Sequence, residues 1–425
     1  MSHRGWKAAA GVAGLAVSVG LAMPAHATNG YFSNGYDAQS IGMAGAGLTL
    51  SQSATSATLN PALGEGEGDS IGGCFTAFRP LRKANVGAGH LTGNYAGYDV
   101  NEGQFTSKRN FFPIPCFGYN HVLDAKSSLG VLMYANGGMD THYAVDPFRA
   151  QGTVGATGVD LAQAFLSVNY ARKIGGGLTL GVAPVLAVQR FEAMGLQGFA
   201  NSTASQYPNN VTNNGYSYSY GGGFKVGATY QPINWLKLAV AYQSQMWMTR
   251  FGKYAGLFAG GGAFDIPASV SEGIDIKPIP AVDVLLEEQH IFYSQIPAIA
   301  NGYTTAAQLG SAAGSGFGWK DMDVWRVALQ WKATPKITLR TGYSHATPFT
   351  NGQGDAEFNI LAPATIRNHV AVGGDYQFTK HWTGTVAYQH AFNASLSGYN
   401  PNDTAQPIAL NMSEDLVSFG VNYKW

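Results

Sequence analysis

The C-terminal segment, residues 415–425, constrains the fold of this chain more than any other stretch. Its apolar and its small or polar positions strictly alternate: Val417, Phe419, Val421, Tyr423 and Trp425 lie between Leu416, Ser418, Gly420, Asn422 and Lys424. Because successive side chains of a β-strand point to opposite faces, the segment has one apolar and one mostly polar face. A soluble sandwich can show this alternation, but an aromatic terminus without a tail is typical of a bacterial outer-membrane barrel. The segment therefore predicts the last strand of a transmembrane β-barrel.

Composition supports a membrane barrel over the other classes. Charged residues make up 12% of the 425 residues, about half of the roughly 25% usual in soluble domains, yet mean hydropathy is only -0.05. Beyond the N-terminus, no apolar run reaches the ~18 residues of a spanning helix. Alternation explains both values, because half of each strand is apolar and half is not. The net charge is +0 without a long basic run, so nothing favours a nucleic-acid partner.

The N-terminus has the pattern of a targeting segment. Arg4 and Lys7 precede an apolar, small-residue core at residues 8–23, and Ala25-His26-Ala27 matches a cleavage site. A membrane anchor would need a longer core and a basic flank after it. We expect residues 1–27 to be a cleaved signal peptide, so that the mature chain begins at Thr28.

Amphipathic runs and turns alternate along the rest of the chain. Short turns rich in Gly and Pro lie at residues 173–177, 231–234, 277–280, 333–335 and 379–380. Longer stretches lie between them, at residues 136–160, 192–216, 249–267, 293–320, 346–367 and 394–414. Short turns at one rim and long loops at the other are characteristic of outer-membrane barrels, so we expect an all-β barrel of about fourteen antiparallel strands. Residues 71–100 fit either one long strand or a hairpin.

The start of the mature chain carries a specific pattern. It contains Thr28-Asn-Gly-Tyr-Phe, a Gly/Ala-rich stretch from Ser40 to Gly47, and Asn60-Pro61-Ala62 ahead of the first strand. Further along, Gly318-Trp-Lys-Asp321 leads into a strand. Together these motifs resemble the FadL/TodX family, outer-membrane transporters of long-chain fatty acids and aromatic hydrocarbons, over essentially the whole mature chain. The terminal Trp425 departs from the Phe that is usual in the family.

The resemblance implies a signal peptide at residues 1–27, an N-terminal hatch at residues 28–69 and a barrel at residues 70–425. In the family, an extracellular apolar groove captures the ligand, a pocket inside the barrel receives it, and a gap beside a kinked strand releases it into the membrane. The expected partners are the ligand, outer-membrane lipid and lipopolysaccharide, and the barrel-assembly machinery that recognises the strand ending at Trp425. A monomer without cofactor, metal or catalytic residues is expected.

Two groups of small residues are candidates for hatch and gating roles. Gly42, Gly45 and Gly47 would permit positive φ in an irregular, tightly packed hatch, and the Asn60-Pro61-Ala62 motif would form a turn. Asn136-Gly137-Gly138 follows a strand and is the candidate wall kink, since adjacent glycines permit bulges and leave the wall unfilled. An ordinary loop start is the alternative for this tripeptide.

Two arginines are candidates for binding a ligand carboxylate. Arg326 and Arg340 lie on the polar faces of two successive strands, and arginine binds carboxylates in a bidentate manner. Both could instead pair with protein carboxylates, and Asp321, Asp323 and Asp375 are available. The stretch Glu287-Glu288-Gln289-His290 is interpreted as part of a solvated rim, and divalent-cation binding beside lipopolysaccharide is the alternative.

The loops at residues 249–267 and 293–317 are unusually apolar. Their large apolar residues are Phe251, Tyr254, Leu257, Phe258, Phe264, Ile296, Ile299 and Leu309. Exposed apolar patches mark binding surfaces, but these side chains could equally pack on each other as a cap over the rim.

Other apparent motifs carry little chemistry. Cys74 and Cys116 could be bonded or free, and two cysteines without clustered histidines do not make a zinc site. Gly68-Asp-Ser-Ile71 resembles the start of a lipase motif but does not follow a buried strand. A passive transporter of hydrophobic molecules is the first hypothesis. A barrel-embedded lipid hydrolase and a diffusion porin for polar solutes are the alternatives.

Overall fold

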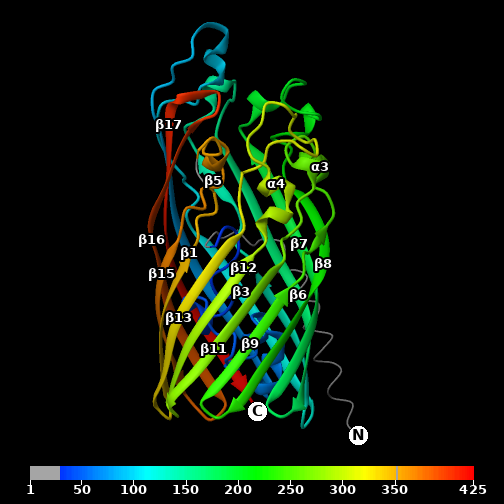
Figure 1. The fold of residues 1–425 in the computed structure, drawn as a ribbon, viewed down its shortest axis with the longest axis vertical. Coiled ribbons are helices and arrows are strands. Elements are labelled where there is room, and N and C mark those ends of the chain that lie inside the picture. The colour runs from blue at the N-terminus through cyan, green and yellow to red at the C-terminus, as the bar shows by residue number, and fades with distance from the viewer. Residues whose placement is uncertain (1–28, 351–352) are drawn as a thin grey trace.

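The chain forms a closed antiparallel β-barrel (Figure 1) in a computed structural model that describes residues 29–350 and 353–425. The predicted signal peptide, residues 1–27, lies outside the described residues. Within them, fourteen long strands form the wall, and the last strand pairs with the first, from Ser70↔Lys424 to Val86↔Ile408. The prediction of a barrel of about fourteen strands is confirmed.

The wall consists of long strands in chain order. They are β1 Ser70–Val86, β3 Phe112–Asp124, β4 Ser127–Ala135, β6 Thr157–Gly175, β7 Leu178–Met194, β8 Ser217–Ile233, β9 Leu236–Gln243, β11 Ser269–Ile279, β12 Val282–Ile291, β13 Met322–Thr334, β14 Ile337–Ala346, β15 Asn368–Gln377, β16 Trp382–Asn400 and β17 Asp403–Lys424. Three short strands, β2 Gly103–Thr106, β5 Asp140–Tyr143 and β10 Trp247–Met248, pair with β1, β6 and β8. Residues 71–100 therefore begin as one long strand and not as a hairpin.

Side-chain alternation sorts the wall into two faces, as predicted. On β13, Trp325, Val327 and Leu329 are exposed, whereas Val324, Arg326 and Ala328 are buried. On β17, Phe419 and Val421 are exposed, whereas Ser418 and Asn422 are buried. The exposed face is apolar because it meets lipid, and the buried face can be polar because it meets the barrel interior.

The two rims differ in the length of their connections (Figure 1). Tight turns join β6 to β7, β8 to β9, β11 to β12, and β13 to β14 at one end, where the C-terminus also lies. Exposed aromatic residues ring this end: Trp235, Trp331, Tyr376, Trp382 and Trp425. Long connections gather at the opposite end. Short periplasmic turns, an aromatic girdle and long extracellular loops orient the barrel in an outer membrane.

One predicted loop is instead part of the sheet. Residues 394–414 were expected to be an extracellular loop, but β16 and β17 continue through them and are joined by a turn at Pro401 and Asn402. The pairing of β17 with β1 extends to Ile408, and the side chain of Asn400 donates to the carbonyl of Tyr98. Cross-strand bonds and this neighbouring loop stabilise a hairpin whose sequence lacks a continuous apolar face.

The N-terminal segment, residues 29–69, lies inside the barrel (Figure 1). It contains the helix α2 Ala38–Ile41 and the 3-10 turns η1 Ser56–Thr58 and η2 Pro61–Glu67. Asp37 caps α2 by accepting a hydrogen bond from the amide of Ser40 at 2.8 Å. In the part of the chain that the structure describes, no helix is long and apolar enough to cross a membrane.

The long loops close the extracellular end. They contain short helical turns: η3 Gly93–Tyr98, η4 Arg149–Gln151, η5 Gln197–Phe199, η6 Pro208–Asn210, η7 Gly252–Tyr254, α3 Ala259–Gly262, η8 Tyr293–Gln295, α4 Pro297–Ala300 and η9 Phe358–Ile360. The predicted apolar loops at residues 249–267 and 293–317 pack together here. Phe251, Phe264 and Ile299 are each 0% exposed, so these side chains form a cap over the rim and not an exposed patch.

Candidate functional site

The ladder between β3 and β4 is interrupted. These strands pair from Asp124↔Ser127 up to Phe117↔Met133 and no further. Above this point, residues 113–116 of β3 form ladder pairs with β1, and residues 134–141 form ladder pairs with β6. We name the region between residues 113–116 and 134–141, where β3 and β4 do not pair with each other, the wall gap.

The chain is irregular and buried at the wall gap. Between β4 and β5, residues 136–139 lie opposite residues 161–163 of β6, so one strand has an extra residue, as in a β-bulge. Residues 134–141 are all buried, whereas the neighbouring wall alternates between buried and exposed positions. Asn136, Gly137 and Gly138 therefore lie in a buried bulge beside a break in the hydrogen-bond ladder.

Side chains of the N-terminal segment reach the wall gap. The hydroxyl of Tyr36 donates to the side chain of Asn136 at 2.8 Å, and the hydroxyl of Ser33 donates to the carbonyl of Ala135 at 3.3 Å. Tyr36 also stacks edge-on against Tyr134 at the end of β4, with ring centroids 5.1 Å apart. The position of the N-terminal segment is thus coupled to the edge of the wall gap by direct contacts.

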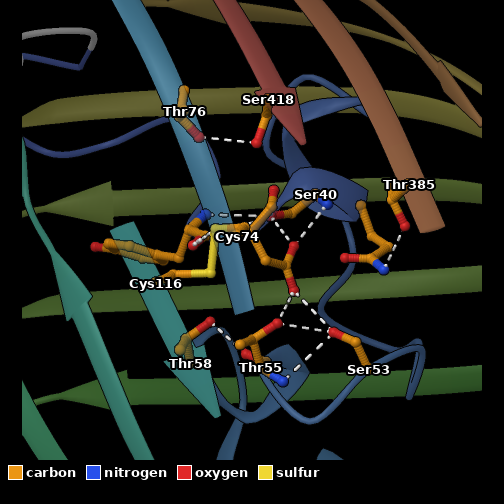
Figure 2. Close-up of a disulfide and its surroundings, with 12 residues drawn as sticks. Ser40, Ser53, Thr55, Thr58, Cys74, Thr76, Cys116, Thr385 and Ser418 are labelled. Atoms are coloured by element: carbon orange, nitrogen blue, oxygen red, sulfur yellow. Dashed lines mark hydrogen bonds between the residues drawn. A yellow bond between two sulfur atoms is a disulfide. The ribbon is translucent and has the colours of Figure 1, made fainter. Parts of the chain in front are cut away.

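A small pocket lies between the N-terminal segment and the wall gap. It is lined by Ser33, Tyr36, Cys74, Ile114, Pro115, Cys116 and Ala135. Cys74 of β1 and Cys116 of β3 form a disulfide, which settles the alternative that the sequence left open. Figure 2 shows this disulfide beside Ser40, Ser53 and Thr55; the last three donate to the buried carboxylate of Asp37, which organises the adjacent turns.

Asn60-Pro61-Ala62 forms a capped turn pressed against the wall. The side chain of Asn60 accepts from the amide of Ala62 at 3.0 Å and donates to the carbonyl of Ala228 in β8 at 3.1 Å. The wall makes room with glycines. A Cβ on Gly181 would lie 2.3 Å from the amide nitrogen of Ala62, and one on Gly227 would lie 2.0 Å from the side-chain oxygen of Asn60. Sequence reasoning missed these two wall glycines, because nothing local marks them.

The three candidate glycines of the segment serve two purposes. Gly45 and Gly47 have φ of 89° and 142°, which other residues rarely adopt. The expectation of positive φ is wrong for Gly42, whose φ is -66°. A Cβ there would lie 3.1 Å from the Cα of Gly373 in β15, so this glycine permits a close approach of the segment to the wall.

The two candidate arginines have different partners. Arg340 forms a bidentate pair with Asp375, at 2.7 and 2.6 Å, and also donates to Gln330. Arg326 donates to Asn34 of the N-terminal segment at 3.2 Å and to Gln289 at 2.8 Å, and no carboxylate of the described residues lies within salt-bridge distance. Arg340 is thus already paired with a carboxylate of the protein, whereas the hydrogen bonds of Arg326 go only to neutral groups.

Glu287 is not part of a solvated rim. Its side chain points into the barrel, is 8% exposed, and accepts from the amides of Gly47 and Leu48 at 2.9 and 2.7 Å. Glu288, the next residue, is on the opposite face, as alternation requires. The prediction of a solvated rim is therefore wrong for Glu287, because its position in β12 lies beside the N-terminal segment inside the barrel.

Aromatic side chains fill the interior above the N-terminal segment. Tyr31 lies 5.2 Å from Tyr293, 6.0 Å from Trp319 and 6.0 Å from Phe264 between ring centroids. The hydroxyl of Tyr293 donates to the carbonyl of Asn29 at 2.5 Å. The beginning of the described chain therefore occupies an aromatic chamber directly below the loops.

An apolar pocket lies among the extracellular loops. We name it the loop pocket; its lining includes Phe148, Phe199, Leu257, Phe258, Leu309 and Phe358. Beside it, Glu357 is 1% exposed and accepts from Gln151 at 2.7 Å, and burial raises the pKa of this carboxyl to about 7. The pocket joins loops from several parts of the chain.

The structure offers little to hydrolytic or metal chemistry. Asp69 pairs with His121 at 2.8 Å, whereas the buried hydroxyl of Ser70 reaches the carbonyl of Gly68. No group of three or more potential metal ligands occurs within residues 29–350 and 353–425.

Comparisons with known proteins agree on one architecture. The model of the outer membrane protein transport protein family (OMPP1/FadL/TodX) matches residues 19–425. The toluene transporter TodX of P. putida is 16% identical, with a TM-score of 0.66, covering 92% of this chain and 99% of that one. A FadL homologue of Pseudomonas aeruginosa is 14% identical, with a TM-score of 0.68 and coverages of 93% and 99%. The toluene transporter TbuX of Ralstonia pickettii is 16% identical, with a TM-score of 0.57 and coverages of 92% and 99%. No curated protein matches the chain.

The fold and the interior define an outer-membrane β-barrel of the transport class. The chain belongs to the outer membrane protein transport protein family, OMPP1/FadL/TodX, because the family model spans nearly all of it. The family resemblance seen in the sequence is confirmed.

Proposed function

We propose that this barrel takes up hydrophobic small molecules, long-chain fatty acids or aromatic hydrocarbons, across the outer membrane by passive transport. The molecules enter through the loop pocket and leave sideways through the wall gap. The observation that carries the proposal is the broken ladder between β3 and β4, which ends at Phe117↔Met133 beside a buried bulge.

The N-terminal segment acts as a hatch that blocks a straight axial path. Wall side chains on many strands hold its backbone: Lys225 donates to the carbonyl of Thr58 at 2.9 Å, and Lys237 donates to that of Thr49 at 2.6 Å. Asn169 donates to the carbonyl of Pro61 at 3.0 Å. An open porin for polar solutes would leave this space to water, so the filled interior disfavours that alternative.

A sideways exit suits an apolar cargo. Each CH₂ kept out of water is worth about 0.8 kcal/mol, so a route from the interior to the bilayer avoids the periplasmic water of an axial pore. The outer surface of the wall is apolar, with exposed Phe75 on β1 and Phe111 before β3 near the wall gap. The ligand passes from one apolar environment to another.

The hatch and the wall gap open together. Tyr31 occupies the aromatic chamber, and Tyr36, five residues further on, bonds Asn136 at the wall gap. A ligand that enters the chamber competes with Tyr31 for the same apolar contacts. Displacement of the segment then breaks the bonds of Ser33 and Tyr36 and clears the pocket behind the wall gap.

The names of similar structures support the class of cargo. TodX and TbuX are described as toluene transporters, and CymD, with a TM-score of 0.58, as a monoaromatic hydrocarbon channel. The FadL homologue of Pseudomonas aeruginosa belongs to the same structural group. Their low identity to this chain leaves the choice between fatty acid and hydrocarbon to experiment.

Uptake of labelled oleate and of labelled toluene by cells with and without this chain tests the proposal. Expression should raise internalised label for at least one of the two, without raising entry of a small polar solute. Equal internalisation with and without the chain would refute hydrophobic uptake. Faster entry of the polar solute alone would favour a porin, and release of fatty acid from labelled phospholipid would favour the hydrolase.

A further inference from the structure

The wall gap is bordered by two prolines on β3. Pro113 and Pro115 fall within a strand that is otherwise regular, from Phe112 to Asp124, in the sequence Phe112-Pro-Ile-Pro-Cys116. Proline has no backbone N–H and is confined in sheets to positions where its amide faces no partner. Two prolines with one residue between them remove donors from the same edge, because alternate residues face the same neighbour.

The structure shows which edge they face. The carbonyl oxygen of Cys116 lies 3.0 Å from the position of a Cβ on Gly73, so the even-numbered residues of this stretch are directed at β1. The carbonyl oxygen of Tyr119 lies 3.1 Å from the corresponding position on Gly130, so the odd-numbered residues are directed at β4. Pro113 and Pro115 are odd-numbered, and both therefore face the wall gap.

The register identifies the missing bonds. The last bonded pair between the strands is Phe117↔Met133. If the same register continued beyond this pair, Pro115 would lie opposite Ala135 and Pro113 would lie opposite Gly137. Two such pairs would exchange four hydrogen bonds, and two of the four are bonds that proline cannot donate. The carbonyl of Ala135, which would accept one of them, instead accepts from Ser33 of the N-terminal segment at 3.3 Å.

We propose that Pro113 and Pro115 hold the wall gap open by denying β4 two of the four hydrogen bonds that would close it. They are positioning residues for transport, and the inference rests on the sideways exit of the proposed function. The ladder to β1 is unaffected, because Phe112, Ile114 and Cys116 supply it and the Cys74–Cys116 disulfide fixes β3 to that side. A donor-free edge also presents no unpaired N–H groups to an apolar molecule, which lowers the cost of its passage.

The double substitution Pro113→Val/Pro115→Val restores both donors with residues that favour strands. Two quantities should be measured in the full-length barrel: hydrogen exchange of the new amides in lipid nanodiscs, and cellular uptake of labelled oleate and of labelled toluene. The matched control is Pro184→Val, which changes a lipid-facing proline of β7 that is paired with Phe224, away from the wall gap. Barrel abundance is followed by heat-modifiable gel mobility in every variant.

The amides of the double variant should be protected from exchange, and uptake should fall to that of cells lacking the chain, whereas Pro184→Val transports normally. Normal uptake at normal abundance would overturn the inference, as would lost uptake with unprotected amides. If the double variant does not assemble, Pro115→Val alone carries the same test, since it borders the last bonded pair. Substitution of Gly137 and Gly138 by valine distinguishes this inference from the proposed function. Normal uptake in the glycine variant would refute the sideways exit itself. Lost uptake in the glycine variant with normal uptake in the proline variant would refute only the role of the prolines.

Discussion

Buried polar side chains decide how the N-terminal segment is held in the barrel. Lys225 illustrates this: its ammonium group donates to the carbonyl of Thr58 and lies 4.7 Å from the ring centre of Tyr134 and 5.3 Å from that of Tyr36. An aromatic face and a carbonyl can together replace the water that the cation loses. Contacts of this kind stabilise the segment strongly, yet each can be exchanged for water when the segment moves.

Glu357 should make the extracellular loops sensitive to pH. Burial raises the pKa of this carboxyl to about 7 from its usual value near 4.5, so the folded loops bind a proton that the unfolded loops have lost. Stability of the loops should therefore fall as pH rises from about 4.5 to about 7 and level off above it. Hydrogen exchange of residues 353–361 should be faster at pH 8 than at pH 5 after correction for the intrinsic rate.

Glu357→Gln is the control for this effect, because its amide is neutral at every pH. The corrected exchange of the same loop should then be independent of pH. The same pH dependence in both proteins would assign it to another group.

Arg326 and Arg340 should respond differently to substitution by methionine. Arg340→Met leaves the partly buried Asp375 without its cation, which costs at most about 3–5 kcal/mol, so the amount of folded barrel should drop. Arg326→Met breaks no ion pair, and the carboxylate of Glu287, which lies opposite it in the ladder, keeps its bonds to the amides of Gly47 and Leu48, so the barrel should form. We propose that Arg326 meets a ligand carboxylate once the segment moves, so Arg326→Met should reduce oleate uptake more than toluene uptake.

The double variant Arg340→Met/Asp375→Asn separates the structural effect, since it removes both charges and should recover much of the folded barrel. Equal losses of oleate and toluene uptake in Arg326→Met would contradict a carboxylate-binding role.

At the scale of strands and loops, alternation predicted most of the wall but not its register. The faces of β13 and β17 follow directly from the period of two. The Arg340–Asp375 pair does not, because it depends on how β14 and β15 align: Arg340 lies opposite Gly373, and Asp375 lies opposite Thr338. The extended β16–β17 hairpin was also missed, since its stability comes from β1 and from a loop distant in sequence.

The candidate site was likewise predicted only in part from the sequence. Composition and family motifs located Asn60-Pro61-Ala62 and Asn136-Gly137-Gly138, both of which lie where the segment or the wall departs from regular structure. The partners of these motifs come from other strands, as with Gly181 and Gly227 beside Asn60. Local sequence does not indicate which distant residues make such contacts, so the contacts are identified only in the folded structure.

Removal of the hatch should open an axial path. Deletion of residues 28–63 should leave a barrel that still shifts mobility on heating, because the wall strands pair with each other and the first closes on the last. Single-channel conductance and sensitivity to a large polar antibiotic should both rise. Unchanged conductance and sensitivity would show that residues 28–63 do not plug the barrel.

A smaller change tests the same element. A Cβ on Gly181 would lie 2.3 Å from the amide of Ala62, so Gly181→Ala should displace the turn and produce a weaker leak. Gly252→Ala is the matched control, because a Cβ there meets nothing within 4 Å.

Over the described residues, the molecule is a closed wall with an interrupted β3–β4 ladder and a filled interior. The ladder runs from β1 around to β17 and back, and the wall gap between β3 and β4 lies beside both the N-terminal segment and the disulfide. The loop pocket lies at the extracellular end, and the aromatic chamber lies between the two. On the proposed route, an apolar molecule passes from the loop pocket through the aromatic chamber to the wall gap and the membrane.

The central claim is that cargo leaves through the wall gap, and the variant Gly137→Val/Gly138→Val tests it most directly. Two valines add bulk to the buried bulge, so they should block the exit without touching the loop pocket. Surface-bound and internalised label are measured separately in cells with equal amounts of heat-modifiable barrel, with Gly252→Val as control. The account predicts normal surface binding and internalisation reduced to that of cells lacking the chain. Normal internalisation at equal barrel abundance would contradict it.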